Sequence, residues 1–443
     1  MKYKQYQKYK DSGVEWIGEI PEHWEVEPLK FHVRINQRTL GENTEDELEI
    51  SYIDVGSVHA GGKIDEPEVM KFVNAPSRAR RIIKKNDTIL STVRTYLKAI
   101  AFVDEKNDGR ICSTGFAVIS PKNNLEPKFL NYLLSSEGYI DHVMANSVGV
   151  TYPAINSSDL GRFPCIKPPL KEAEKISKFL FDETTHLDNL ISKSQSQVNL
   201  LQEKRQALIN HAVTKGLDPN VPMKDSGVEW IGEIPEPWEV KRLRHIVQPK
   251  GLVRGPFGSN LKIDSFVEEG YKVYEQKNAI YQNIELGDSY INQEKFSELN
   301  RFSIRENDFL MSCSGTIGKS FLVPKKHSPG IINQALLIIR YSPEIVEFEF
   351  MSYVMDSFWF QTRIIDNSHG GAMKNLVGIH DFTHIKMPIP PKPEQKQIYD
   401  FLQKETKQFD DLISKSQSQI KMLQEKRQGL ITATVTGKID VRK

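Results

Sequence analysis

Two segments of this sequence occur twice. Residues 10–30 and 224–244, called the signature below, agree at 17 of 21 positions, and both contain DSGVEWIGEIPE. Residues 187–214 and 409–436 agree at 19 of 28 positions, whereas the stretches between the repeated segments differ. Because the repeat is as long as a domain, we predict two modules. The repeated segments form a common framework, and the differing stretches between them give the two modules different recognition surfaces.

The composition is that of a globular protein. The 443 residues, 39% hydrophobic and 26% charged, are enough for more than one core. No apolar run is long enough to cross a membrane, and the polar start lacks the apolar core of a signal peptide. Cys112, Cys165 and Cys313 are too widely spaced for a disulfide framework or a metal site, so we expect reduced thiols and a cytoplasmic location. The net charge of +1 neither requires nor excludes a nucleic-acid partner, because charge can gather on one face.

Each copy of the repeat follows the same plan. After the signature comes a variable region (30–167 or 245–389), in which β-type runs alternate with helical patterns. Tandem prolines then precede a long helix. The predicted fold class is α/β (α+β), with two globular domains joined by two long helices in an antiparallel coiled coil. The expected parts are a first domain at 1–170, a first helical spacer at 171–216, a linker and second domain at 217–391, and a second helical spacer with a tail at 392–443.

The two long helices carry a coiled-coil pattern, with positions spaced alternately by four and three residues. The apolar positions of this seam are Leu187, Ile191, Val198, Leu201 and Leu208 in the first helix, and Phe409, Ile413, Ile420, Leu423 and Leu430 in the second. Serine and arginine also occupy seam positions in both copies, where they either set the register or indicate burial on more than one side. We favour pairing of the helices with each other over packing of each helix on its own domain, because the helix sequence is kept while the domains have diverged. Gly216 and Gly437 are predicted to end the helices.

No catalytic motif is present in the sequence. GTIGKS at 315–320 resembles a phosphate-binding loop, but Cys313 stands where the first glycine is needed, so a tight turn is expected. The sequence contains no HExxH, paired CxxC, GxSxG or GxGxxG motif, and no Asp/Asn-Pro-Pro-aromatic motif of the kind that methyltransferases use to hold a flipped base. We therefore expect a binding or adaptor subunit, with no catalytic residue and no metal site.

Basic residues gather in the variable regions. A run of charges is commonly a solvated face, but arginine and lysine on adaptable loops also suit phosphate contact and base reading. The candidate DNA-binding residues are Arg78, Arg80, Arg81, Arg94 and Lys98 in the first variable region, and Arg254, Lys262, Lys319 and Lys374 in the second.

The chain resembles the DNA-specificity subunit of type I restriction-modification systems in four features. They are the signature, the NDxxxS run before GTIGK, the tandem-proline sequence PPKPEQ before the second long helix, and the helix sequence LDxLI…LLQEKRQALI. In that family, two target-recognition domains each read one half of a split, asymmetric DNA sequence. Two helical regions pair antiparallel and dock two methyltransferase subunits, and restriction motor (endonuclease) subunits join that core. The resemblance implies double-stranded DNA and these subunits as partners. It also implies no cofactor on this chain, since methyl donor, ATP and Mg²⁺ bind the partners.

The first copy departs from this pattern, with PPLKEAEK and VRTYLKA where the second copy has PPKPEQKQ and SGTIGKS. These departures leave the fold prediction intact but prevent the transfer of loop residues between copies. Three alternatives stay open on sequence alone: a recognition subunit of another restriction or methylation system, an enzyme such as a fused methyltransferase-nuclease or a free-standing nuclease, and a protein-only scaffold. Salt-dependent binding of duplex DNA would separate the scaffold from the specificity subunit.

Overall fold

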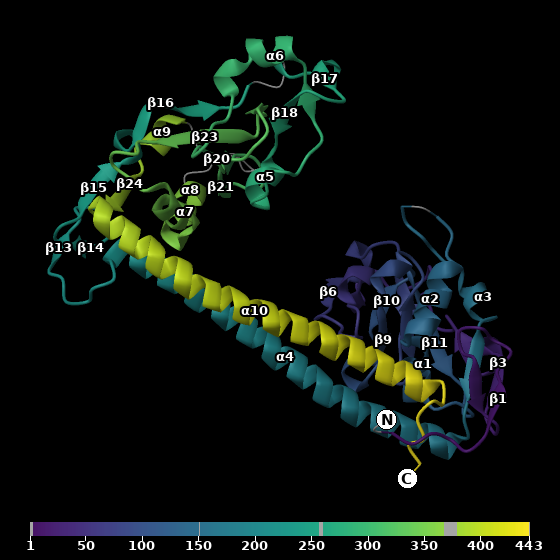
Figure 1. Ribbon diagram of the computed structural model, residues 1–443. Helices are drawn as coiled ribbons and strands as arrows, with labels where there is room; N and C mark the ends of the chain where they lie inside the picture. The colour runs from purple at the N-terminus through teal and green to yellow at the C-terminus, as the bar shows by residue number, and fades with distance from the viewer. Residues whose placement is uncertain (1–2, 150, 257–259, 367–378, 443) are drawn as a thin grey trace. The chain divides into compact units, whose positions relative to one another are not determined.

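The computed structural model describes residues 3–149, 151–256, 260–366 and 379–442. The chain divides into two compact units, one made of residues 1–195 and 417–443 and the other of residues 196–416. Each unit contains one signature, one variable region and part of both long helices (Figure 1).

The first unit is built on two four-stranded sheets. One sheet has the order β4 (Val33–Ile35), β11 (Phe116–Pro121), β8 (Thr88–Ser91), β9 (Ile100–Phe102), with all neighbours antiparallel. The other has the order β6 (Glu68–Lys71), β5 (Glu49–Ile53), β10 (Ile111–Ser113), β7 (Ala79–Ile82), in which β5 and β10 are parallel. The remaining elements are β1 (Tyr9–Asp11) paired with β2 (Glu19–Pro21), β3 (Glu25–Pro28) paired with β12 (Pro164–Lys167), and helices α1 (Pro127–Leu134), α2 (Glu137–Ala145) and α3 (Ser157–Leu160).

The second unit repeats the strand order of the first sheet despite its different sequence, whereas its second sheet has its parallel pair at the edge rather than in the centre. Its first sheet has the order β16 (Val247–Arg254), β23 (Leu336–Tyr341), β20 (Phe309–Ser312), β21 (Ser320–Leu322). Its second has the order β17 (Phe266–Val267), β19 (Tyr290–Ile291), β18 (Tyr271–Tyr274), β22 (Gly330–Ile332), again with one parallel pair. The remaining elements are β13 (Met223–Asp225) with β14 (Glu233–Pro235), β15 (Glu239–Arg242) with β24 (Lys386–Ile389), α5 (Gln276–Ile280), α6 (Gln293–Glu298), α7 (Phe348–Asp356), α8 (Phe358–Asp366) and α9 (Ile379–Thr383).

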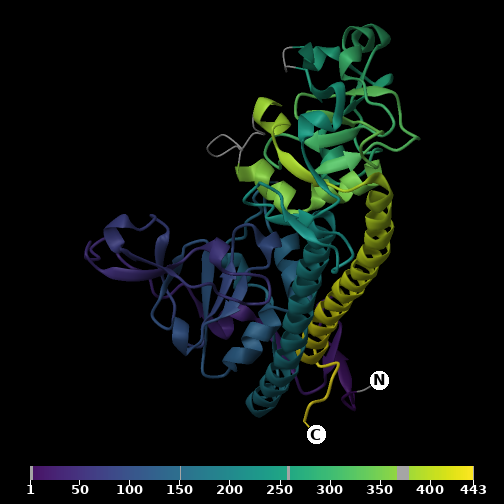
Figure 2. The same cartoon turned by 90° about the vertical axis from the view of Figure 1, so that its left-hand side faces the viewer.

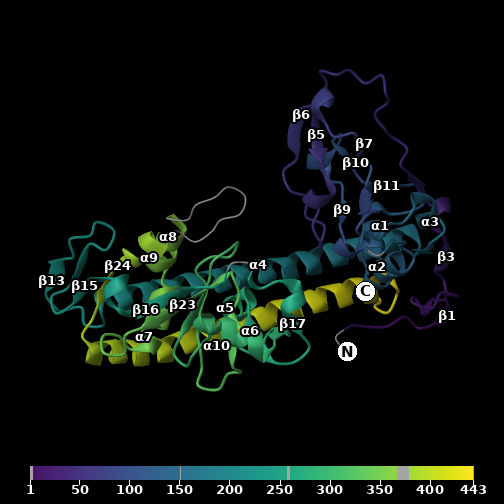
Figure 3. The same cartoon turned by 90° about the horizontal axis from the view of Figure 1, so that it is seen from above.

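Two long helices complete the fold, α4 (Leu170–Lys215) and α10 (Lys392–Val435). Both begin directly after the tandem prolines. A proline disfavours the helical conformation of the residue before it, so a helix starts only after the proline pair. Both end as predicted at a glycine in the left-handed conformation, Gly216 at φ 77° and Gly437 at φ 74°. The helices run side by side in every view (Figure 1, Figure 2 and Figure 3).

The helices pair antiparallel, and the same ion pair occurs at both ends of the pairing. In the first unit, Arg427 Nε lies 2.7 Å from Asp188 Oδ1. In the second unit, Arg205 Nε lies 2.9 Å from Asp410 Oδ1. Each pair joins an early residue of one helix to a late residue of the other, as antiparallel helices require. The seam arginines therefore have partners across the helix pair, and all ten apolar seam residues are buried or half-buried. The predicted fold class is confirmed.

Each unit's main core includes the end of the helix from the other copy of the repeat. In the first unit, the signature residue Trp24 belongs to the same cluster as Ile176, near the start of α4, and Ile431, near the end of α10. In the second unit, Trp238 shares a cluster with Ile398, near the start of α10, and Ile209, near the end of α4. Neither core is closed by its own repeat alone.

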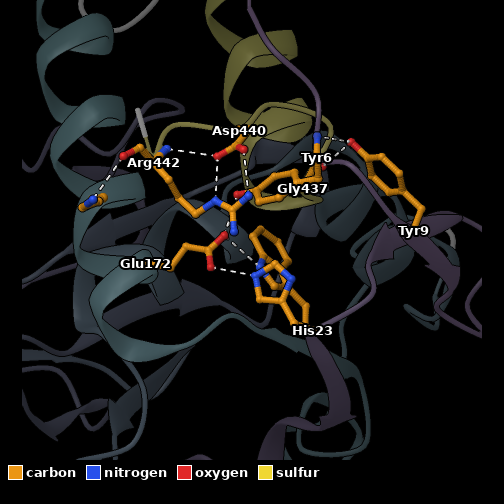
Figure 4. Close-up of polar contacts among 9 residues, drawn as sticks. Tyr6, Tyr9, His23, Glu172, Gly437, Asp440 and Arg442 are labelled. Carbon is orange, nitrogen blue, oxygen red and sulfur yellow. Dashed lines mark hydrogen bonds and ion pairs between the residues drawn. The ribbon is translucent and has the colours of Figure 1, made fainter.

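A polar cluster in the first unit joins the start of α4 to both ends of the chain (Figure 4). The buried carboxylate of Glu172 accepts hydrogen bonds from Tyr6 Oη (2.6 Å), Trp24 Nε1 (3.1 Å) and His23 Nε2 (2.8 Å). The pKa of Tyr6 is raised mainly by burial and secondarily by the hydrogen bond to Glu172. The Tyr6 hydroxyl therefore stays protonated and acts as the donor. The Arg442 guanidinium lies 4.7 Å from the centre of the Tyr6 ring. Residues near the carboxyl end thus pack against the signature and the first long helix.

The three cysteines are free and buried, one in each of three different strands or loops. Burial raises the pKa of the Cys112, Cys165 and Cys313 thiols to about 12. At pH 8 the reactive thiolate is then about one part in 10⁴ of each thiol, and side-chain packing blocks access as well. We expect native protein to react with iodoacetamide at least ~100-fold more slowly than protein in denaturant, measured by mass spectrometry of the three peptides. A thiol that reacts at the rate of free cysteine would contradict this placement.

Candidate nucleic-acid interface

Two of the predicted basic residues lie within the second sheet of the first unit. Arg80 and Arg81 are on β7, and both are half-buried. The Arg80 guanidinium lies 4.6 Å from the centre of the Phe72 ring, and Arg81 donates a hydrogen bond to Thr39 Oγ1 (3.2 Å). Both side chains therefore have a contact within the first unit, and DNA contact by them stays a prediction.

Arg78 and Arg94 lie on loops that flank the same turn. Thr114 donates its backbone N–H to the Arg78 carbonyl (2.8 Å), and the Gly115 carbonyl accepts from Thr92 N (2.8 Å), two residues before Arg94. Arg78 is exposed, and its Nε lies 3.8 Å from Asp54 Oδ1 at the edge of ion-pair distance. The folding of the first variable region thus brings the backbone segments that carry these two arginines to the same turn.

Arg94 and Lys98 flank the 3-10 turn Thr95–Leu97, which lies in the loop between β8 and β9. Both have left-handed backbones, with φ values of 50° and 53°. Both are exposed, and neither forms an ion pair with a carboxylate of the described residues. The Arg94 guanidinium lies 4.9 Å from the centre of the Tyr152 ring, which comes from a loop more than fifty residues later.

Apolar and aromatic side chains lie beside these arginines, and the sequence did not predict them as part of a site. Tyr152 and Val148 are 61% and 81% exposed, and Tyr96 is 47% exposed. Large apolar side chains exposed together on one surface commonly mark an interaction site. The only signal in the sequence is weak: glycine and proline around residues 149–153 indicate a loop, and a tyrosine within it can be exposed.

The predicted basic residues of the second unit are spread over three loops. Arg254 ends β16, is half-buried and lies beside the Cys313 thiol. Lys262 and Lys319 are exposed, the first just before a short 3-10 turn and the second between β20 and β21. Lys374, and the HGG sequence at 369–371, lie outside the described residues.

The GTIGKS sequence forms the tight turn that was predicted. Gly318 N donates to the Ser312 carbonyl (2.9 Å), and Lys319 N donates to Ser312 Oγ (3.1 Å). A strand, β21, follows this turn, whereas a phosphate-binding loop leads into a helix whose N-terminus holds the phosphate. The turn is therefore not a nucleotide site.

The described part of the chain shows neither a metal cluster nor a membrane-spanning helix. Within the described ranges, no three His, Cys, Asp or Glu side chains gather as metal ligands would. None of the helices in the described part of the chain combines the length and hydrophobicity needed to cross a membrane.

The surface described above belongs to a chain with clear relatives. The family model for the type I restriction modification DNA specificity domain matches residues 21–200 and again residues 235–422. The chain belongs to this family. The family match on both copies confirms the resemblance predicted from the repeated motifs.

The individual matches extend over nearly the whole chain. The putative type I restriction enzyme MjaX specificity subunit of Methanocaldococcus jannaschii is 26% identical, with 96% of each chain covered. The MjaVIII specificity subunit of the same organism is 24% identical, over 96% of this chain and 94% of the relative. A solved chain from a study of assembly and conformational transition of the type I R-M system aligns with a TM-score of 0.72 at 20% identity, covering 95% of this chain and 99% of the other. The chain is a non-catalytic, DNA-recognising specificity subunit.

Proposed function

We propose that the two units read different halves of one bipartite, asymmetric DNA sequence. The supporting observation is that the variable regions differ in sequence but share the strand order of one four-stranded sheet, and that both lie between the same repeated segments. Two domains that share a framework but differ in their surface loops are suited to recognise two different DNA sequences in the same way. Each wrong base pair costs about 1–3 kcal/mol, so two readers multiply the discrimination of one.

The exposed members of the predicted basic group are proposed to contact DNA. Arg78, Arg94 and Lys98 serve the first unit, and Lys262 and Lys319 serve the second. Their exposure supports this role, because phosphates and base edges are reached only by side chains free of the core. Arg80 and Arg81 are left out, because they are half-buried and contact Phe72 and Thr39 of the same unit.

The paired helices are proposed to dock two methyltransferase subunits, with restriction motor (endonuclease) subunits joining that core. Among the exposed apolar side chains of the two helices, Leu200 (50% exposed) and Met422 (62% exposed) stand at the same position of the repeat. A matched pair of exposed apolar residues suits two equivalent docking sites. Methyl donor, ATP and Mg²⁺ would then bind those partners, and the complex would act on DNA in the cytoplasm.

Exchange of one variable region tests the proposal. Residues 30–167 are replaced by the corresponding region of another specificity subunit, the chain is expressed with its methyltransferase partner, and methylated sites are mapped by sequencing. One half of the target should change and the other half should stay the same, because the second unit is untouched. Exchange of residues 245–389 is the matched control and should change only the other half. A change in both halves from either exchange would refute independent reading.

A further inference from the structure

Arg94 occupies a backbone position where the other copy of the repeat has glycine. The two copies align from Asn86 and Asn307, which both have left-handed backbones, and this alignment places Arg94 opposite Gly315. Both residues are left-handed, with φ 50° for Arg94 and φ 65° for Gly315. Glycine adopts this conformation freely, whereas arginine is strained in it. A strained side chain in place of a suitable glycine points to a function for that side chain.

The Arg94 guanidinium is oriented but has no acceptor. It lies 4.9 Å from the centre of the Tyr152 ring, and no described residue accepts a hydrogen bond from it or forms an ion pair with it. Contact with an aromatic face holds a flat guanidinium in place while its N–H donors stay available. The donors therefore remain free for a ligand that offers two acceptors side by side.

Hydrogen bonds and a β-bridge join the two loops that carry Arg94 and Tyr152. Ile155 N donates to the Thr92 carbonyl (2.9 Å), and the Thr95 and Ser147 hydroxyls lie 3.0 Å apart. Val93 forms an isolated β-bridge with Ala154. The geometry of the arginine and its aromatic partner is thus set before any ligand binds, which lowers the entropic cost of recognition.

The side chains around this pair suit nucleic acid. Val148 and Tyr96 are exposed beside it, and Lys98 lies four residues beyond Arg94 on the same loop. An exposed apolar and aromatic surface with unpaired cations matches the composition of groove contacts, where bases and phosphates meet the protein together. A solvated charged face would not expose these apolar groups.

We propose that Arg94 is a specificity-determining residue that reads one guanine of the first half-site through O6 and N7, and that Tyr152 positions it. Double-stranded DNA is the ligand, so this inference rests on the proposed function. Arginine with two parallel donors fits the acceptor pair of guanine in the major groove. Lysine at the same position would keep the charge but lose the paired donors.

The test uses the full-length chain in complex with its methyltransferase partner. Methylated sites are mapped, and duplexes with single substitutions are compared for binding. Arg94→Gly, which introduces the residue of the second copy and relieves the backbone, should lower discrimination at one G·C pair of the first half-site by ~5- to ~150-fold. The second half-site should be unaffected and the melting temperature should not fall. Arg94→Lys should relax the same position.

Variants of the partner ring and a matched lysine complete the design. Tyr152→Phe should behave like wild type, since it keeps the ring, whereas Tyr152→Ala should relax the position that Arg94→Gly relaxes. Lys106→Ala, an exposed lysine of the first unit that is paired with Glu66, should change nothing. Equal weakening for all sequences, or a lower melting temperature for Arg94→Gly, would overturn the inference. If the Arg94→Gly variant keeps a bipartite target and unchanged selectivity, the proposed role of Arg94 is refuted and the proposed function stands. If the wild-type target is not bipartite, the proposed function is refuted.

Discussion

Replacement of Ile431 by aspartate is expected to unfold the first unit, although Ile431 belongs to the helix that follows the second variable region. Ile431 is 1% exposed and lies in the core cluster that contains Trp24. A carboxylate buried there without a partner costs several kcal/mol, which is a large part of the ~5–15 kcal/mol that stabilises a domain. Hydrogen exchange of the first unit should rise towards the unfolded rate, and recognition of the first half-site should be lost.

The repeat supplies a matched variant for this experiment. Ile209 stands at the position of α4 that corresponds to Ile431 in α10, and it is completely buried in the core that contains Trp238. Ile209→Asp should therefore unfold the second unit, although Ile209 follows the first variable region. Leu200→Asp and Met422→Asp, at exposed helix positions, should leave both units folded. If Ile431→Asp damaged the second unit and Ile209→Asp the first, each helix end would belong to its own repeat and the crossed packing would be wrong.

The sequence was sufficient for the parts of the fold that depend on local rules. The helix ends at Gly216 and Gly437, the starts after tandem prolines and the alternating seam all follow from neighbouring residues. It was insufficient for the partner of each helix end. Both copies of the signature and both helix ends are nearly the same, so a helix end fits either signature equally well. Only the folded chain distinguishes the two packings.

The candidate site shows the same division. The sequence identified Arg80, Arg81 and Arg94 as equal members of one basic group. Their difference comes from the contacts that the fold gives each of them: Arg80 and Arg81 contact Phe72 and Thr39, while Tyr152, from a distant loop, holds Arg94 at the surface. The alignment of Arg94 with Gly315 was available in the sequence, but a left-handed arginine becomes evident only from the backbone.

Residues 1–222 alone are expected to form a homodimer and not a folded monomer. The first unit needs α10 residues such as Leu430, Ile431 and Val435 to close its core, and this half-chain lacks them. The end of α4 carries the same residue types at the corresponding positions, Leu208, Ile209 and Val213, so a second copy can supply them. A two-fold dimer reads a two-fold site, and its target should be the first half-site repeated as an interrupted palindrome.

The half-chain is expressed with its methyltransferase partner, its mass is measured by analytical ultracentrifugation, and its methylated sites are mapped. One substitution then distinguishes the assembly. In the dimer, Ile209→Asp should abolish recognition of the first half-site, because the core of each protomer contains Ile209 of the other protomer. In the full-length chain, the same substitution should spare the first half-site, because Ile431 closes that core. A monomeric half-chain that still directs methylation, or an asymmetric target, would show that the helix end is not required for the reader to fold.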